Sequence, residues 1–205
     1  MRYDWVTVAI DFVYVSWFSV MFTTFFVTAF QPELSMYRHR VALSIILAWS
    51  ISGVVLATLF ASAGPVYFSN VTGAPNPYLP MLDYLQEVDV RYGLFARAIH
   101  AELWQAFTAP SSVSMITAFP SVHVTFASLL ACACFRMNFW LRYLSIAYAV
   151  AIFAGSIWLG WHYSADGYVG ALVALASWKA ARHLTRWYHG SGAFECARGD
   201  WKHQP

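Results

Sequence analysis

The sequence predicts an all-α, polytopic membrane helix bundle with about five spans. Of its 205 residues, 60% are hydrophobic and 11% are charged. Soluble domains are about 45–50% apolar and about 25% charged. Several apolar stretches reach the roughly 20 residues that a transmembrane helix needs. The net charge of +2 comes with no block of like charge, so we expect a bilayer environment and no nucleic-acid partner.

Five apolar stretches are the candidate spans. They are Trp5–Phe30, Val41–Ala63, Val122–Phe135, Tyr143–Leu159 and Tyr163–Ala180. The third is short, so we expect its outer end to lie below the membrane surface. The first stretch is too long for a secretory signal, and its flanks carry no small-residue cleavage pattern.

Basic residues mark alternate connections between these spans. They are Arg38 and Arg40 after the first span, Arg136 and Arg142 after the third, and Lys179, Arg182 and Arg186 after the fifth. The positive-inside rule places these connections in the cytoplasm. The N-terminus, the connection 64–120 and the turn near Gly160 are then extracytoplasmic, and we expect a bacterial inner or cell membrane. An outer N-terminus without a signal suggests that an upstream helix is missing.

The outer connection carries structure of its own. Apolar residues recur at roughly helical spacing between Met81 and Phe107, which predicts one or two amphipathic helices at the interface. They would either cap the bundle or help to bind substrate. We expect one membrane-embedded domain over residues 1–187 and a disordered cytoplasmic tail over residues 188–205. The sequence does not predict an oligomeric state.

Two short segments carry the chemistry. Phe119-Pro120-Ser121-Val122-His123 opens the third span, with Ser121 as a helix-start signal. His162 and Asp166 open the fifth span four residues apart, so on a helix they share a face. The predicted topology brings both histidines to the outer side of the membrane.

These residues suit transfer of a phosphoryl group through a phosphohistidine. Asp166 would accept a hydrogen bond from one ring nitrogen of His162, which leaves the other nitrogen as the nucleophile. The N-terminus of the helix at His123 would attract phosphate. A metal site built from the two histidines and Asp166 is the alternative, with His100 as the one further imidazole in the outer connection. No second-shell pattern supports it, so we expect neither metal nor cofactor.

The two histidine segments resemble those of the type 2 phosphatidic acid phosphatase superfamily. The matching residues are 118–123 and 162–170, and the resemblance extends from the first span to the fifth. The segment 61–68, which includes Gly64 and Tyr67, is similar to one in the inositol phosphorylceramide synthase-like branch.

This resemblance implies a bundle of six helices with a metal-independent extracytoplasmic site. It implies that His162 forms the phosphohistidine, that Asp166 orients it, and that His123 is the general acid and then the general base. It also implies that Ser121, beside Pro120, binds phosphate oxygens together with nearby backbone N–H groups.

The chain departs from the phosphatase pattern in its cations. That pattern has a Lys and an Arg in a first motif and an Arg six residues before the nucleophile, where this chain has Ser156. Arg91 and Arg97 would either reach over the site or pair with acidic neighbours. Asp11, in the first span, would either bind a polar head group or form a hydrogen bond between helices.

The resulting hypothesis is a membrane enzyme that acts on a phospholipid or sphingolipid at the extracytoplasmic face. It would transfer the phosphoryl-containing group to a hydroxyl acceptor through a phosphohistidine. One alternative is a plain lipid phosphate phosphatase that hydrolyses monoesters. The other is a non-catalytic membrane transporter or assembly factor. The sequence does not name the lipid donor or the acceptor.

Overall fold

The computed structural model describes residues 3–30, 36–109 and 116–190. Every regular element in these ranges is helical, and large apolar side chains cover much of the outside of the bundle. An apolar exterior on a long helical bundle is what a bilayer stabilises. The expected all-α membrane helix bundle is therefore confirmed.

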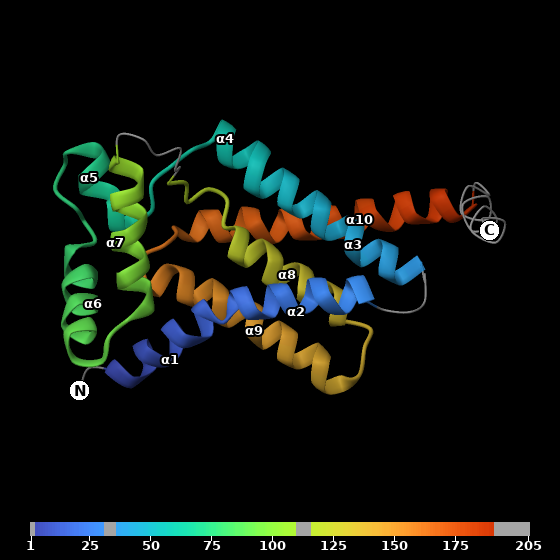
Figure 1. Cartoon of the computed structure of the whole chain (residues 1–205), viewed down its shortest axis with the longest axis horizontal. Coiled ribbons are helices and arrows are strands. Elements are labelled where there is room, and N and C mark those ends of the chain that lie inside the picture. The colour runs from blue at the N-terminus through green and yellow to red at the C-terminus, as the bar shows by residue number, and fades with distance from the viewer. Residues whose placement is uncertain (1–2, 31–35, 110–115, 191–205) are drawn as a thin grey trace, which may run out of the picture.

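The helices follow one another in a simple order (Figure 1). The first part of the chain contains α1 (Asp4–Val15), α2 (Trp17–Phe30), α3 (Met36–Trp49), a π-helical turn (Ser50–Leu56) and α4 (Ala57–Leu59). The middle contains a 3₁₀ turn (Pro65–Tyr67), α5 (Phe68–Thr72), α6 (Leu79–Tyr92) and α7 (Phe95–Thr108). The last part contains α8 (Val122–Cys134), α9 (Phe139–Trp158) and α10 (Ser164–Gly190).

Three helical rods in the described ranges are long and apolar enough to cross a membrane. They are Asp4–Phe30, Met36–Leu59 and Phe139–Trp158. The helix expected to be short, α8, has 13 residues. The last helix, α10, is 27 residues long and carries charged residues in its second half. It continues to Gly190, three residues into the segment expected to be a tail; residues 191–205 lie outside the described part.

The first expected span is two helices that meet at Ser16. Its hydroxyl donates a 2.6 Å hydrogen bond to the carbonyl oxygen of Val13. Such a bond competes with the helical ladder and bends a helix. The bend separates α1 from α2 (Figure 1).

The centre of the bundle is α8, which packs against α3, α9 and α10. Small residues on α10 allow this close approach. A Cβ added to Gly170 would lie 2.7 Å from the carbonyl oxygen of Ser121 and 2.9 Å from Oγ1 of Thr125. The N-terminus of α8, with the first histidine segment, is thereby held against the first turns of α10.

Helices α5, α6 and α7 gather at one end of the bundle (Figure 1). The expected amphipathic stretch is two helices, because Gly93 ends α6 with a positive φ of 71°. Oδ1 of Asp89 then accepts a 2.8 Å hydrogen bond from the N–H of Leu94. Both histidine segments lie at the end of the bundle that these helices cover.

Candidate functional site

His162 lies in the short turn that joins α9 to α10. Gly160 makes the turn with a φ of 76°, a left-handed conformation that glycine adopts without strain. The N–H groups of Trp161 and His162 then donate to the carbonyl oxygen of Ser156 over 3.0 and 3.1 Å. His162 is 7% exposed. The backbone therefore fixes a nearly buried imidazole beside α8.

The imidazole of His162 is oriented by a backbone carbonyl. Its Nδ1 lies 2.7 Å from the carbonyl oxygen of Ala118, a distance typical of a hydrogen bond. A carbonyl can only accept, so Nδ1 carries the proton and Nε2 has a free lone pair. Ala118 is held in turn by its N–H, which donates to the carbonyl oxygen of Ser62.

Asp166 lies beside His162 but has another partner. Its Oδ2 is 3.7 Å from Nδ1 of His162, beyond hydrogen-bond distance, and accepts a 2.8 Å hydrogen bond from the N–H of Tyr163. Asp166 is the third residue of α10, so this contact is the reach-back half of a capping box. The sequence predicts a hydrogen bond from one ring nitrogen of His162 to Asp166; in the structure the carbonyl oxygen of Ala118 accepts the bond from Nδ1, and Asp166 lies 3.7 Å away.

His123 stands on the first turn of α8, facing the same region. Its ring centroid is 6.1 Å from that of His162. The ring of Tyr14 stacks on that of His123 with 4.7 Å between centroids, and the ring centroid of Trp17 is 4.3 Å from that of His123. The structure therefore brings together the two histidines and Asp166, as expected, and adds two aromatic residues from the first rod. No sequence signal marks Tyr14 and Trp17, because an aromatic residue in an apolar helix looks the same whether it faces lipid or a site.

Ser121 is fully buried and acts as the N-cap of α8. Its hydroxyl accepts from the N–H of Val124 at 3.4 Å, and its own N–H donates to the carbonyl oxygen of Asp166 at 3.1 Å. These contacts tie α8 to the start of α10. Pro120, also buried, precedes it. Ser121 thus positions the two motifs relative to each other, and its hydroxyl already has a structural partner.

Gly64 and Tyr67 lie against the turn that carries His162. A Cβ on Gly64 would be 2.1 Å from the carbonyl oxygen of Trp161, so only glycine fits there. Tyr67 donates a 3.0 Å hydrogen bond to the backbone oxygen of His100, on α7. This segment therefore joins the turn at His162 to the helices at the end of the bundle.

Comparison with known families gives one match. The family model described as the PAP2 superfamily matches residues 1–180. The chain belongs to the PAP2 superfamily. It is therefore a lipid enzyme of the general phosphatase or phosphotransferase type. The searches of curated proteins and of solved structures give no match.

The remaining predicted site residues of this PAP2 protein do not reach the histidines. Asp11, 2% exposed, accepts hydrogen bonds of 2.7 and 2.9 Å from the N–H groups of Phe95 and Ala96. It therefore caps the N-terminus of α7 from a neighbouring helix. Of its two expected roles, the structure shows the hydrogen bond between helices.

The two arginines of the outer helices are engaged with neighbouring side chains. Arg91 pairs with Asp4 at 2.6 Å and with Glu87 at 3.7 Å. Arg97 donates a 2.5 Å hydrogen bond to Oε1 of Gln86. At the described end of the PAP2 bundle, neither forms a clamp over the histidines. No group of three His, Cys, Asp or Glu side chains in the described ranges is arranged to hold a metal ion.

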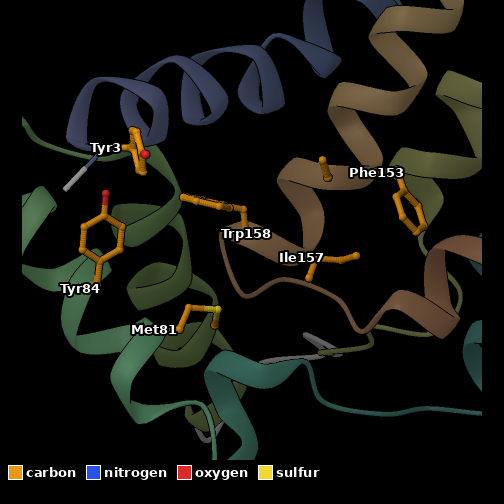
Figure 2. A pocket seen from close by; sticks show the side chains of 7 residues that line it. Tyr3, Met81, Tyr84, Phe153, Ile157 and Trp158 are labelled. Atoms are coloured by element: carbon orange, nitrogen blue, oxygen red, sulfur yellow. The ribbon is translucent and has the colours of Figure 1, made fainter. Parts of the chain in front are cut away.

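An apolar groove of about 750 Å³ lies beside α9. Figure 2 shows its side chains between α1, α6 and α9. They are Tyr3, Met81, Tyr84, Phe153, Ala154, Ile157 and Trp158. Its volume is within the range of ligand pockets. One wall is a helix long enough to span the membrane.

Proposed function

We propose that this PAP2 protein transfers a phosphoryl-containing group between lipid and alcohol hydroxyls through a phosphohistidine on His162. The observation that carries the proposal is the free Nε2 of His162. Its partner nitrogen is held 2.7 Å from the Ala118 carbonyl, and His123 stands beside it. A fixed nucleophile with an acid–base group in reach is the arrangement that nucleophilic catalysis needs.

The first step breaks one P–O bond and forms one P–N bond. The lone pair on Nε2 of His162 attacks phosphorus, and the protonated ring of His123 gives its proton to the departing alkoxide oxygen. His162 gains positive charge, which the Asp166 carboxylate at 3.7 Å stabilises. The departing alcohol leaves with the proton of His123.

The second step reverses these changes with a new alcohol. His123, now neutral, takes the proton of the acceptor hydroxyl, and the alkoxide oxygen attacks phosphorus. An O–P bond forms and the N–P bond to His162 breaks. Water at this step gives hydrolysis instead. The near-complete burial of His162 favours an alcohol that arrives with its own apolar surface over bulk water.

The scarcity of free cations at this site favours a phosphodiester as donor. A monoester carries close to two negative charges near neutral pH, and a diester carries one. Arg91 and Arg97 are engaged with other side chains. The smaller charge of a diester matches a site that offers mainly histidines and helix N-termini.

The apolar groove on α9 supports a lipid as substrate. It has an almost wholly apolar lining and lies between α1, α6 and α9 (Figure 2). Its residue Trp158 ends α9, four residues before His162. A lipid acyl chain is the occupant with matching chemistry, because α9 also has the length of a membrane span. We place this end on the extracytoplasmic side, as the positive-inside rule predicts.

Trapping the intermediate tests the proposal. Purified protein is incubated with a phosphodiester lipid labelled in its phosphate and then denatured in alkali, in which phosphohistidine is stable. We expect label on the wild type, none on His162→Ala, and slower labelling of His123→Ala. His183→Ala, an exposed histidine on α10, is the matched control and should be labelled like the wild type. Equal labelling of His162→Ala would refute the mechanism.

Substrate choice separates the transferase from the plain phosphatase. A phosphatidic acid and a phosphodiester lipid are assayed side by side, with and without an alcohol acceptor. The proposal expects acceptor product from the diester. Fast hydrolysis of the monoester, with no acceptor product from the diester, would make the protein a plain lipid phosphatase. No turnover of either lipid by folded protein would favour the transporter or assembly factor.

A further inference from the structure

Next to the catalytic turn lies a second group of polar side chains, on α7. His100 is 3% exposed, and neither of its ring nitrogens has a hydrogen-bond partner. Nε1 of Trp161 and Nε of Arg97 are likewise buried without a partner. Buried polar groups in native proteins are nearly always paired, so several unpaired ones in one place call for an explanation.

The rings of His100 and Trp161 are in contact, and Arg97 lies three residues before His100 on α7. The ring of His100 is 3.9 Å from that of Trp161, and Trp161 directly precedes His162. Tyr14 links the two groups, because its ring stacks on Trp161 at 6.1 Å and on His123 at 4.7 Å. The unpaired donors and acceptors are therefore continuous with the site at which phosphorus would bind.

His100 offers uncharged hydrogen bonding. Burial, and to a smaller extent the nearby Arg97 guanidinium, lower the pKa of His100 to about 3. At neutral pH the ring thus has one N–H donor and one acceptor nitrogen. A hydroxyl group, which both donates and accepts, matches this pair. An ammonium group, which only donates, satisfies half of it.

Aromatic rings surround these polar atoms. Tyr67 stacks on Trp104 at 5.6 Å and contacts the ring of His100 edge-on at 6.0 Å. Apolar faces with a few converging polar groups are the usual composition of a site for a small uncharged molecule. The C–H faces of a polyol or sugar suit the rings, and its hydroxyls suit the nitrogens.

We propose that His100, Trp161 and Arg97 form a subsite for the hydroxyl groups of a polyol head group, the part of the donor that stays bonded to phosphorus. The inference rests on the proposed function. The leaving and accepting alcohols must lie at His123, which contacts Tyr14 and Trp17. The retained head group then lies next to Trp161, which directly precedes His162 and contacts His100.

A matched pair of donors tests the subsite. Phosphatidylglycerol has two head-group hydroxyls, and phosphatidylpropanol has the same three head-group carbons with neither. We expect the wild type to prefer phosphatidylglycerol at least about tenfold in kcat/KM, since a buried donor or acceptor left unpaired is costly. A wild-type ratio near one overturns the subsite, whatever the variants do.

Variants of His100 test whether this side chain causes the preference for phosphatidylglycerol. His100→Phe keeps a ring against Trp161 and should bring the ratio close to one, with turnover of phosphatidylpropanol changed by less than about threefold. His100→Asn keeps one donor and one acceptor and should retain part of the ratio. His183→Phe is the control and should leave it unchanged. An equal loss on both lipids in His100→Phe would mean that the residue is structural and would overturn the proposal.

A binding measurement separates this inference from the proposed chemistry. The His162→Ala protein in detergent should melt at a higher temperature with phosphatidylglycerol than with phosphatidylpropanol, because a ligand that binds the folded state stabilises it. Selective stabilisation with no turnover by the wild type would refute the proposed chemistry alone. Turnover of both lipids at equal rates, with equal stabilisation, would refute the subsite alone.

Discussion

His162 donates its Nδ1 proton to the carbonyl oxygen of Ala118 over 2.7 Å. In the proposed mechanism this bond determines which nitrogen attacks phosphorus, and it joins the segment before α8 to the turn that carries His162. It also separates two tasks that one carboxylate performs in many histidine sites. Here Ala118 fixes the tautomer, and Asp166 supplies negative charge and caps α10.

Substitution of Asp166 by Asn should reveal this division. The Asn side-chain oxygen can still accept from the N–H of Tyr163, so we expect α10 to remain capped and the protein to fold. The positive charge that develops on His162 loses its nearby carboxylate, and kcat should fall about 10- to 100-fold, less than the roughly 10⁴-fold loss seen where the carboxylate itself sets the tautomer. The kcat is measured at saturating lipid, with circular dichroism as the check on folding.

Asp166→Ala is the companion variant. It removes both the charge and the capping contact, so it should also lower the melting temperature, since loss of a cap costs about 1 kcal/mol. An Asp166→Asn protein with unchanged kcat would contradict the electrostatic role.

A methyl group at position 64 should break the turn that carries His162. In Gly64→Ala the new Cβ would lie 2.1 Å from the carbonyl oxygen of Trp161, and both are parts of tightly packed segments. We expect a destabilisation of about 1–3 kcal/mol and a large loss of activity, measured by melting in detergent and by lipid turnover.

Gly53→Ala is the matched control for this variant. A Cβ there would make ordinary contacts, the nearest being 3.5 Å from the indole of Trp49. Its stability and activity should remain close to those of the wild type. Equal stability and activity of the two alanine variants would mean that the close approach of Gly64 to Trp161 is not required for either.

Some of this site could be predicted from the sequence, and some could not. The sequence predicts that His123, His162 and Asp166 lie together, because His123 follows the helix-start signal at Ser121, His162 and Asp166 lie where the last helix begins, and the spans alternate across the bundle. The partner of His162 could not be predicted, because a backbone carbonyl at Ala118 leaves no mark in the sequence. The spacing of apolar residues predicts one or two outer helices, and the structure has two. The sequence marks His100 only as a further imidazole, because its unpaired burial depends on packing against Trp161.

The role of Asp11 illustrates the same limit. A carboxylate inside an apolar helix predicts a polar partner, but not which one. The partner is the N-terminus of α7, more than eighty residues away in the chain. Only the packing of α1 against α7 reveals it.

Removing the Asp11 carboxylate should therefore affect stability more than catalysis. Asp11→Ala leaves the N–H groups of Phe95 and Ala96 unpaired, and we expect a loss of about 1–2 kcal/mol. The KM for lipid should change little in the protein that remains folded. Asp11→Asn should recover part of the stability, because its side-chain oxygen can accept one of the two bonds. A large rise in KM with unchanged melting would instead assign Asp11 to head-group binding.

Single cysteines test which side of the membrane the site faces. With the native cysteines replaced, cysteines at Ser69 and Ala74, both in the outer connection, should react with a membrane-impermeant reagent in intact cells. Cysteines at Tyr37 and Asn138 should not, because basic residues flank them and the positive-inside rule places them in the cytoplasm. Disrupted cells, in which all four should react, provide the control. The reverse pattern in intact cells would put the histidines on the cytoplasmic side.

The buried imidazole of His100 predicts how stability depends on pH. Burial lowers its pKa to about 3 in the folded protein, whereas an unfolded histidine has a pKa of about 6.5. Between these values the unfolded chain binds the additional proton, so stability is lost as the pH falls from about 6.5 towards 3. Each pH unit in this window costs up to about 1.4 kcal/mol for this one group.

His100→Phe removes this contribution. The fall in melting temperature between pH 6.5 and pH 4.5 should therefore be smaller in His100→Phe than in the wild type. His183→Phe, on an exposed histidine, should retain the wild-type slope. The other histidines are the same in the wild type and in His100→Phe, so the comparison isolates His100. Identical slopes in the wild type and His100→Phe would show that the imidazole is not held neutral, and that its two ring nitrogens are not available as the uncharged donor and acceptor that a hydroxyl would need.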